Sequence, residues 1–183
     1  DLAEFHRSEK TNGPWNFITL TNAVHEISPW DLAQILVHVL ERLHDSGCLY
    51  MYDMDQLSSP ELGAVLWTGS EFSEVLATLC RSLGCPEYVP EVGTWPHRSC
   101  NGWNVLLIRD HMQLPEDWLS RTKEAVEATT KCIKEVLLRK LRLTQKALEA
   151  LTKFGSETGQ EATDKVKLLY DFFAITRVLE VPK

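Results

Sequence analysis

The stretch FITLTNAVHEISPWDLAQILVHVLERLHDSGCLYMYDM, residues 17 to 54, places a helical pattern between two apolar runs. The runs Phe17–Asn22 and Cys48–Met54 are rich in β-branched, aromatic and other apolar residues, which predicts two short buried strands. Ser28 and Pro29 are typical of a helix start, and Gly47 is expected at the end of that helix. Strand, helix and strand in this order predict a parallel pair joined by a right-handed crossover.

The chain after Met54 continues the alternation of helix and strand. A helical pattern covers about Pro60–Leu83, and two glycines, Gly63 and Gly69, predict a break inside it. Two further strands are expected at 87–95 and 102–112, and the short link between them favours an antiparallel hairpin. The predicted fold class is therefore α/β, with parallel strands followed by an antiparallel hairpin.

The character of the sequence changes after Met112. Residues 116–154 contain neither Gly nor Pro, and large aliphatic residues recur on one helical face. GSETGQ at 155–160 predicts a turn, and a second amphipathic helix follows it. We therefore expect an α/β region over residues 1–112 and an α-helical hairpin extension over residues 113–183.

Composition and charge argue against several classes of function. The 19 basic and 26 acidic residues give a net charge of -7, which does not favour nucleic acid or an anionic membrane as partner. The apolar runs are far shorter than the roughly 20 residues that a membrane-spanning helix needs. The 5 cysteines include no C-x-x-C, which indicates reduced thiols and hence a cytoplasmic or nuclear protein.

Two surface features of the C-terminal region have more than one explanation. Six basic residues between Lys131 and Lys146 form a run without interleaved aromatic residues, which favours a solvated face or an acidic partner over nucleic acid. The apolar stripe on the opposite face of the same helix is more extensive than half a domain can cover. It predicts a protein–protein interaction surface, with a homodimer through the C-terminal helices as one form of it.

The quoted stretch resembles the fourth strand, the following helix and the fifth strand of class I S-adenosylmethionine-dependent methyltransferases. The continuation CRSLGCPEYVPEVGTW (80–95) and WNVLLIRD (103–110) resembles the next helix and the reversed hairpin that closes the sheet of that family. The resemblance covers roughly residues 1–112 and implies a Rossmann-like methyltransferase half-sheet. The implied activity is the transfer of a methyl group from S-adenosylmethionine to an acceptor that the sequence does not identify.

The sequence departs from that family where the cofactor binds, because it has no G-x-G-x-x-G or relaxed form of this motif. By the resemblance, Asp1 and Leu2 correspond to the family's contact with the adenine amino group, and Asn22 is a further cofactor-binding candidate. We expect the chain to be inactive alone and to be completed by an upstream half of the domain or by another protein chain. The alternative is an inactive methyltransferase-like module that dimerises or docks a partner through its helical hairpin.

Side chains at the carboxyl ends of the two parallel strands form the candidate site, because ligands of open α/β sheets bind there. The resemblance implies that His25 is a general base, since imidazole releases its proton near neutral pH, and that Glu26 orients the ring or contacts the acceptor. The alternative is that His25 caps the end of the strand and binds the next helix.

Three further residues are candidates for contact with the substrate. Asp53 and Asp55 end the second strand, where carboxylates contact substrates or cap neighbouring helices. Trp67, together with Tyr50 and Tyr52, is a candidate for an acceptor pocket, and the alternative for all three aromatic residues is a place in the core.

The sequence does not predict a metal site. A C-x4-C…H-x2-C pattern is present, formed by Cys80, Cys85, His97 and Cys100. Its spacing is not that of a tight zinc knuckle, because Cys80 falls inside a predicted helix and Cys85 follows the helix stop. Small buried cysteines are the favoured explanation of the pattern.

Overall fold

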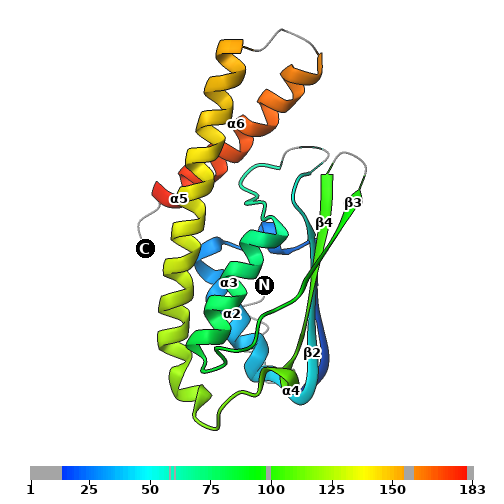
Figure 1. Cartoon of the computed structure of the whole chain (residues 1–183), viewed down its shortest axis with the longest axis vertical. Helices are drawn as coiled ribbons and strands as arrows, with labels where there is room; N and C mark the ends of the chain where they lie inside the picture. Colours follow the sequence, from blue (N-terminus) through cyan, green and yellow to red (C-terminus); the bar gives the residue numbers. More distant parts are fainter. Residues whose placement is uncertain (1–13, 58, 60, 98–99, 155–158, 181–183) are drawn as a thin grey trace.

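The computed structural model describes residues 14–57, 59, 61–97, 100–154 and 159–180. The secondary structure elements are, in chain order, β1 (Trp15–Thr21), η2 (Val24–Glu26), α2 (Pro29–Arg42), β2 (Leu43–Met54), α3 (Gly69–Ser82), β3 (Val92–His97), β4 (Cys100–Ile108), α4 (Arg109–Met112), η3 (Trp118–Arg121), α5 (Thr122–Phe154) and α6 (Gly159–Glu180). Figure 1 shows their arrangement.

The four strands form one mixed sheet in the order β1-β2-β4-β3. β1 and β2 pair in parallel, with Leu20 opposite Met51, while β4 runs antiparallel to both β2 and β3. The predicted α/β class, the parallel pair and the antiparallel hairpin are therefore confirmed. The sheet is compatible with a Rossmann-like half-sheet.

The first helix ends earlier than the sequence predicts. α2 stops at Arg42 and β2 begins at Leu43, because the buried Leu43 side chain joins the core and the chain turns into the sheet there. Gly47 therefore lies within β2 and not at the end of the helix. A Cβ atom at Gly47 would lie 2.7 Å from the carbonyl oxygen of Trp15, so glycine allows the start of β1 to approach closely.

The predicted helix at 60–83 is also shorter than expected, because α3 starts only at Gly69. Thr68 is its N-cap: the Thr68 hydroxyl accepts from the Glu71 backbone N–H at 3.2 Å, and the Glu71 carboxylate accepts from the Thr68 N–H at 2.8 Å. This capping box fixes the helix start. The segment before it is a loop in which Gly63 adopts a φ of 89°, in the left-handed region.

The two hairpin strands are displaced from their predicted positions. The strand expected at 87–95 begins at Val92, since Pro90 has no amide N–H to give to a strand ladder. The strand expected at 102–112 ends at Ile108, and the short helix α4 follows it.

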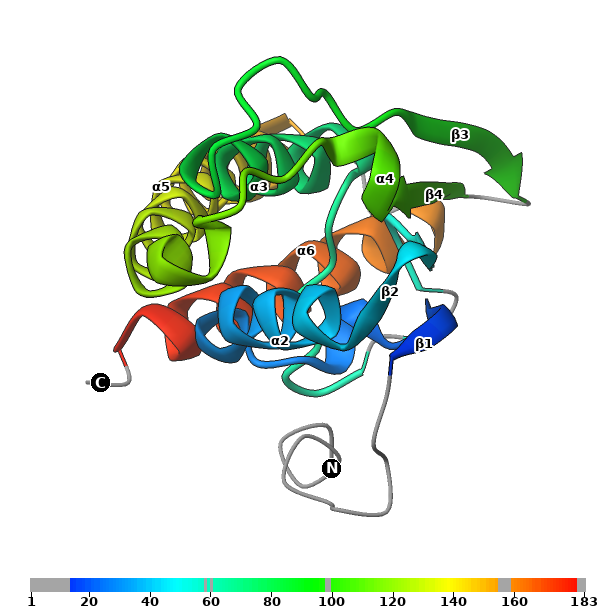
Figure 2. The same ribbon diagram turned by 90° about the horizontal axis from the view of Figure 1, so that it is seen from below.

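The helices α2, α3 and α5 lie on one side of the sheet, as Figures 1 and 2 show. The strand residues that face them are buried: Leu49 and Met51 on β2, and Trp103 and Val105 on β4, belong to the core. No described helix covers the other face in either view. The region between sheet and helices thus forms the single core of the described residues.

The second face of the sheet is apolar and accessible. Phe17 on β1 is 56% exposed and Leu106 on β4 is 47% exposed, and Tyr50 and Tyr52 on β2 are half-buried between them. Trp95 on β3 stacks beside Tyr52, with 5.9 Å between ring centroids. We call this surface the open sheet face. Sheets that contain parallel strands are usually covered on both faces, so the open sheet face is unusual for such a pair.

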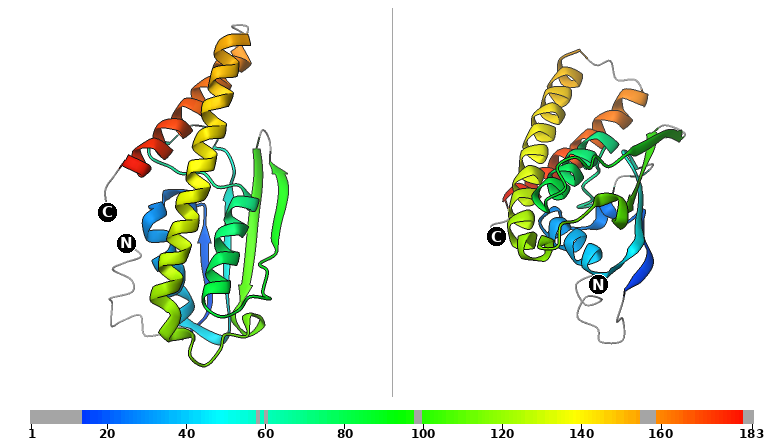
Figure 3. Two further views of the ribbon diagram at one scale, coloured as in Figure 1. Left: turned by 60° about the vertical axis from the view of Figure 1, so that its left-hand side comes forward. Right: turned by 60° about the horizontal axis from the view of Figure 1, so that its bottom comes forward.

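The helices α5 and α6 form a hairpin that extends past the end of the sheet (Figure 3). At about 1.5 Å per residue, the 33-residue α5 is about 50 Å long. The part of α5 up to Lys140 packs on α3, with Ile133 and Leu137 in the core and an ion pair of 2.8 Å between Lys140 and Glu71. α6 folds back until the Trp30 indole N–H on α2 donates to the carbonyl of Val178 at 3.0 Å. None of the helices within the described ranges is long and apolar enough to cross a membrane.

Candidate functional site

His25 and Asp53 form a hydrogen-bonded pair at the carboxyl ends of the two parallel strands. His25 lies in η2, which follows β1 after a short turn, and Asp53 is the penultimate residue of β2. The ring Nδ1 of His25 lies 2.8 Å and 2.9 Å from the two carboxylate oxygens of Asp53. The two residues are 5% and 1% exposed, so the pair is shielded from bulk water.

The Asp53 carboxylate is held by the backbone as well. It accepts from the N–H of His25 at 3.0 Å and from the N–H of Met54 at 2.8 Å. A carboxylate can only accept, so the ring nitrogen that faces it, Nδ1, carries the hydrogen. In the neutral imidazole, Nε2 then presents its lone pair on the other side of the ring.

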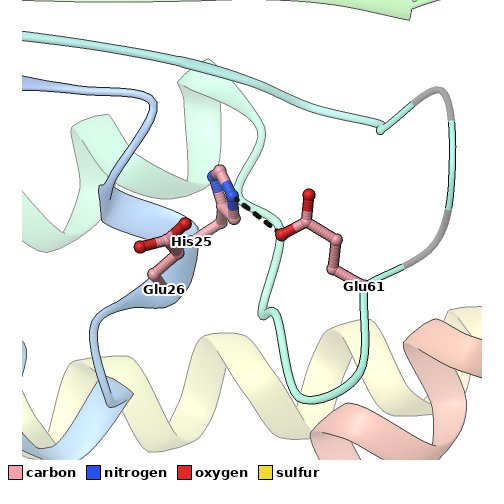
Figure 4. Close-up of side chains that lie close together, drawn as sticks. All are labelled: His25, Glu26 and Glu61. Carbon is pink, nitrogen blue, oxygen red and sulfur yellow. Dashed lines mark ion pairs between the residues drawn. The ribbon is translucent and has the colours of Figure 1, made fainter.

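The Nε2 atom of His25 points toward the loop that precedes α3 (Figure 4). It lies 3.7 Å from Oε2 of Glu61, a distance too long for a hydrogen bond. Glu61 is 54% exposed. The loop that follows it is held in place, because the N–H of Val65 donates to the carbonyl of His25 at 3.0 Å. The proton-accepting side of the ring therefore faces an accessible acidic loop.

The turn between β1 and η2, which positions His25, depends on Asn22. Its backbone has a φ of 49°, in the left-handed region where asparagine is among the better tolerated residues. The Asn22 N–H still donates to the carbonyl of Tyr52 at 2.9 Å, which closes the parallel ladder. The chain then turns into η2. Asn22 itself is exposed at the rim of the site.

The structure brings only some of the predicted site residues together. Glu26 is exposed beside His25, and the side chain that orients the ring is Asp53. Asp55 binds Asn101 instead, accepting from its backbone N–H at 2.8 Å and from its side-chain amide at 2.9 Å, and so ties the end of β2 to β4. Asp1 and Leu2 lie outside the described residues.

Trp67 lies in the core and not at the rim. Its ring packs edge-on against Phe72, and its carbonyl accepts from the indole N–H of Trp103 at 2.8 Å. Its own indole N–H has no hydrogen-bond partner among the described residues. Of the aromatic residues considered for an acceptor pocket, Trp67 thus takes the core position, while Tyr50 and Tyr52 lie on the open sheet face.

The cysteines of the C-x4-C…H-x2-C pattern differ in environment. Burial raises the pKa of Cys80 to about 12 and also raises the pKa of Cys85. Cys100 is half-buried in β4. Thiols that remain protonated are weak nucleophiles and weak metal ligands, so Cys80 and Cys85 are core residues in their chemistry as well as in their position.

A groove of about 430 Å³ lies beyond Glu61, between the loop and α6. Its lining is mainly apolar and includes Leu62, Val166, Leu169, Tyr170 and Phe173, with Arg177 contributing a positive charge. Leu62 and Phe173 are among the most exposed large apolar side chains of the described residues. We call this feature the arm groove.

The sequence places both His25 and Asp53 at the carboxyl ends of the parallel strands, but it did not predict that they pair, and it gave no indication of Glu61. The carboxylate that orients the ring is 28 residues away in the chain, and only the register of the parallel pair makes it a neighbour. Glu61 lies in a loop without any periodic pattern, so nothing local indicates its position. Comparisons of the chain with protein-family models, with curated proteins and with solved structures found no match.

Proposed function

We propose that this chain is the C-terminal part of a methyltransferase-like domain, in which His25 accepts the proton of the methyl acceptor. The observation that carries the proposal is the buried Asp53–His25 pair at the carboxyl ends of parallel strands. Asp53 holds the tautomer in which Nε2 is free, and the backbone N–H groups hold Asp53. This is the arrangement that a general base requires.

The role of each group follows from this geometry. The methyl donor would keep the electron pair of its broken carbon–sulfur bond as the methyl group moves to the acceptor, and the acceptor would lose its proton to Nε2 of His25. Asp53 balances the positive charge that develops on the ring, as the carboxylate does in other pairs of this kind. Glu61 lies at the entrance, where its carboxylate attracts the protonated ring or a cationic part of the acceptor.

The described residues do not form a cradle for S-adenosylmethionine. Asn22 is the one predicted cofactor contact among them, and the chain has no glycine-rich loop that could approach the cofactor closely. The cofactor would supply the methyl group, and the residues that hold it would come from another part of the domain. We therefore assign to this chain the acid–base group and not the methyl donor site.

The sheet supports completion by a further segment. β1 stands at the edge of the described sheet, with β2 as its partner. Phe17 on this edge strand and Leu106 on β4 expose apolar surface on the open sheet face. A preceding strand beside β1, with helices on the open sheet face, would bury both surfaces.

The test combines a binding measurement with an activity measurement. Calorimetric titration of S-adenosylmethionine should show no binding to this chain alone and saturable binding to a longer protein in which this chain is joined to the rest of the proposed domain. Transfer of a radiolabelled methyl group to fractionated cell extract should then be lost in His25→Ala while cofactor binding is retained. If the longer protein does not bind the cofactor, or if His25→Ala transfers the label normally, the proposal fails.

The second candidate function is that of an inactive module that docks a partner, and the arm groove is the observation that favours it. Its apolar side chains Leu62 and Phe173 are more accessible than a purely structural hairpin requires. Light scattering on the full chain should then show a dimer or larger assembly that Phe173→Ser disrupts. Exposed Leu119, which lies outside the groove, provides the control Leu119→Ser. A dilute monomer with an intact hairpin argues against this candidate.

A further inference from the structure

We infer that His25, Glu26 and Glu61 bind a divalent transition-metal ion, with Zn²⁺ as the best-matched ion. Their potential ligand atoms all lie within 4.8 Å of one another. This inference goes beyond the proposed function and does not depend on it. Figure 4 shows the imidazole of His25 between the two carboxylate side chains.

The His25 imidazole has the hydrogen bonding that is typical of metal-binding histidines. Such histidines donate their other ring N–H to a carboxylate or a carbonyl group, which fixes the ring and increases its basicity. Asp53 plays this part here, with its oxygens 2.8 Å and 2.9 Å from Nδ1. His25 is 5% exposed, and no hydrogen bond to its Nε2 is present among the described residues. A buried, oriented nitrogen with no hydrogen-bond partner thus faces the carboxylate of Glu61, and Glu26 belongs to the same cluster.

The spacing of the atoms fits a shared ion better than a direct contact. Two atoms bound at about 2.1 Å to one tetrahedral zinc ion are about 3.4 Å apart. The measured separation of His25 Nε2 and Glu61 Oε2 is 3.7 Å, slightly more than this value and beyond hydrogen-bond range. Glu26 and Glu61 are exposed, so small rotations of their side chains can complete the site without repacking the core.

The choice of ion follows from the ligands. Two carboxylates balance the charge of a divalent cation, and the imidazole favours zinc and neighbouring first-row metals over Mg²⁺ and Ca²⁺, which prefer oxygen ligands. Three protein ligands leave a fourth position for water, as in catalytic zinc sites. A bound ion would also link η2 to the loop before α3, across the existing hydrogen bond from Val65 to His25.

Metal binding and proton acceptance use the same lone pair of His25. A metal ion on Nε2 therefore prevents His25 from acting as a base. If the methyl transfer proposed above is correct, added Zn²⁺ should inhibit it, and a chelator should restore it. If that proposal fails, the direct measurement of metal binding is unaffected.

The binding test uses the full chain, purified and treated with a chelator. Zn²⁺ is titrated calorimetrically, and Co²⁺ is titrated while its visible absorption is recorded, since this absorption reports ligand type and geometry. We expect one tetrahedral or five-coordinate site without a thiolate charge-transfer band. Affinity should fall more than tenfold in Glu61→Gln and in Glu26→Gln, and on the order of 10- to 100-fold in Asp53→Asn, which removes the group behind the ring.

Matched controls separate this site from other ligands on the surface. Glu127→Gln and His111→Ala each change an exposed residue outside the site and should leave the affinity unchanged. His25→Ala should abolish binding, and if it fails to fold by circular dichroism, the two exposed glutamate variants carry the test. Affinity that is unchanged in both glutamate variants, a thiolate band that Cys48→Ser removes, or the absence of binding at millimolar metal would each overturn the inference.

Discussion

The carboxylate of Asp53 accepts hydrogen bonds from both the backbone N–H and the ring Nδ1 of His25. One buried side chain thus fixes the end of β1 to the end of β2 and sets the orientation of the imidazole. Asp53 therefore both stabilises the fold at this point and fixes the tautomer of the imidazole.

Asp53→Asn should destabilise the protein, because an amide cannot accept on both sides and leaves a buried N–H group without a partner. The expected loss is about 1–3 kcal/mol of unfolding free energy. Urea denaturation followed by circular dichroism measures it. Asp110→Asn, which changes an exposed carboxylate, is the control and should stay within about 0.5 kcal/mol of the parent. Equal stability of the two variants would show that the pair contributes little.

Gly47→Ala should be strongly destabilising, because the added methyl group would meet backbone atoms that cannot move aside. Its Cβ would lie 2.7 Å from the oxygen of Trp15 and 2.9 Å from the oxygen of His44. We expect a loss of about 1–3 kcal/mol, as for other overpacked positions. Gly159→Ala is the matched control, since no atom lies within 4 Å of its added Cβ. Thermal unfolding that ranks the two variants in the opposite order would contradict this account of β2.

Asp171 should reduce stability at neutral pH. Burial raises its pKa above the ordinary value of 3.8, so ionisation is more costly in the folded than in the unfolded state. Its contribution is most favourable below the unfolded pKa and is lost as the pH rises through the folded pKa. Asp171→Asn should therefore unfold at higher urea concentration than the parent at pH 7, and the difference should disappear near pH 3. Asp164→Asn on the same helix is the control, and a pH-independent effect of Asp171→Asn would contradict the prediction.

The cysteines should react with alkylating reagents in a fixed order. Burial raises the pKa of Cys80 to about 12, so at pH 8 hardly any thiolate is available at this position. Cys48 and Cys100 are half-buried and should be labelled first in the native protein. Peptide mapping by mass spectrometry after a short iodoacetamide pulse provides the measurement. Early labelling of Cys80 would show that α3 opens readily.

The sequence predicts the parallel pair well because its signals are local. The continuous apolar run Leu49–Tyr52 and a proline at the start of α2 each act within a few residues. The ends of the elements are less predictable, since the start of β2 at Leu43 depends on packing against the core and the start of α3 depends on the Thr68–Glu71 capping box.

The candidate site is likewise only partly predictable from local sequence signals. His25 could be identified from its place after a strand, because the carboxyl ends of parallel strands are where ligands bind. Its pairing with Asp53 depends on the register between strands, and its proximity to Glu61 depends on how the loop folds back. The open sheet face could not be foreseen either, because the continuous apolar run of β2 is typical of a strand that is covered on both faces.

β1 lies at the edge of the sheet that the described residues form, and this position has a consequence for hydrogen–deuterium exchange. Along a strand that has a single neighbour, amide protons directed at that neighbour are protected, whereas those in between face outward. Deuterium uptake along β1 should therefore alternate between slow and fast residues. When another strand binds to this side, the fast residues should become slow, and nuclear magnetic resonance can locate the event at single amides.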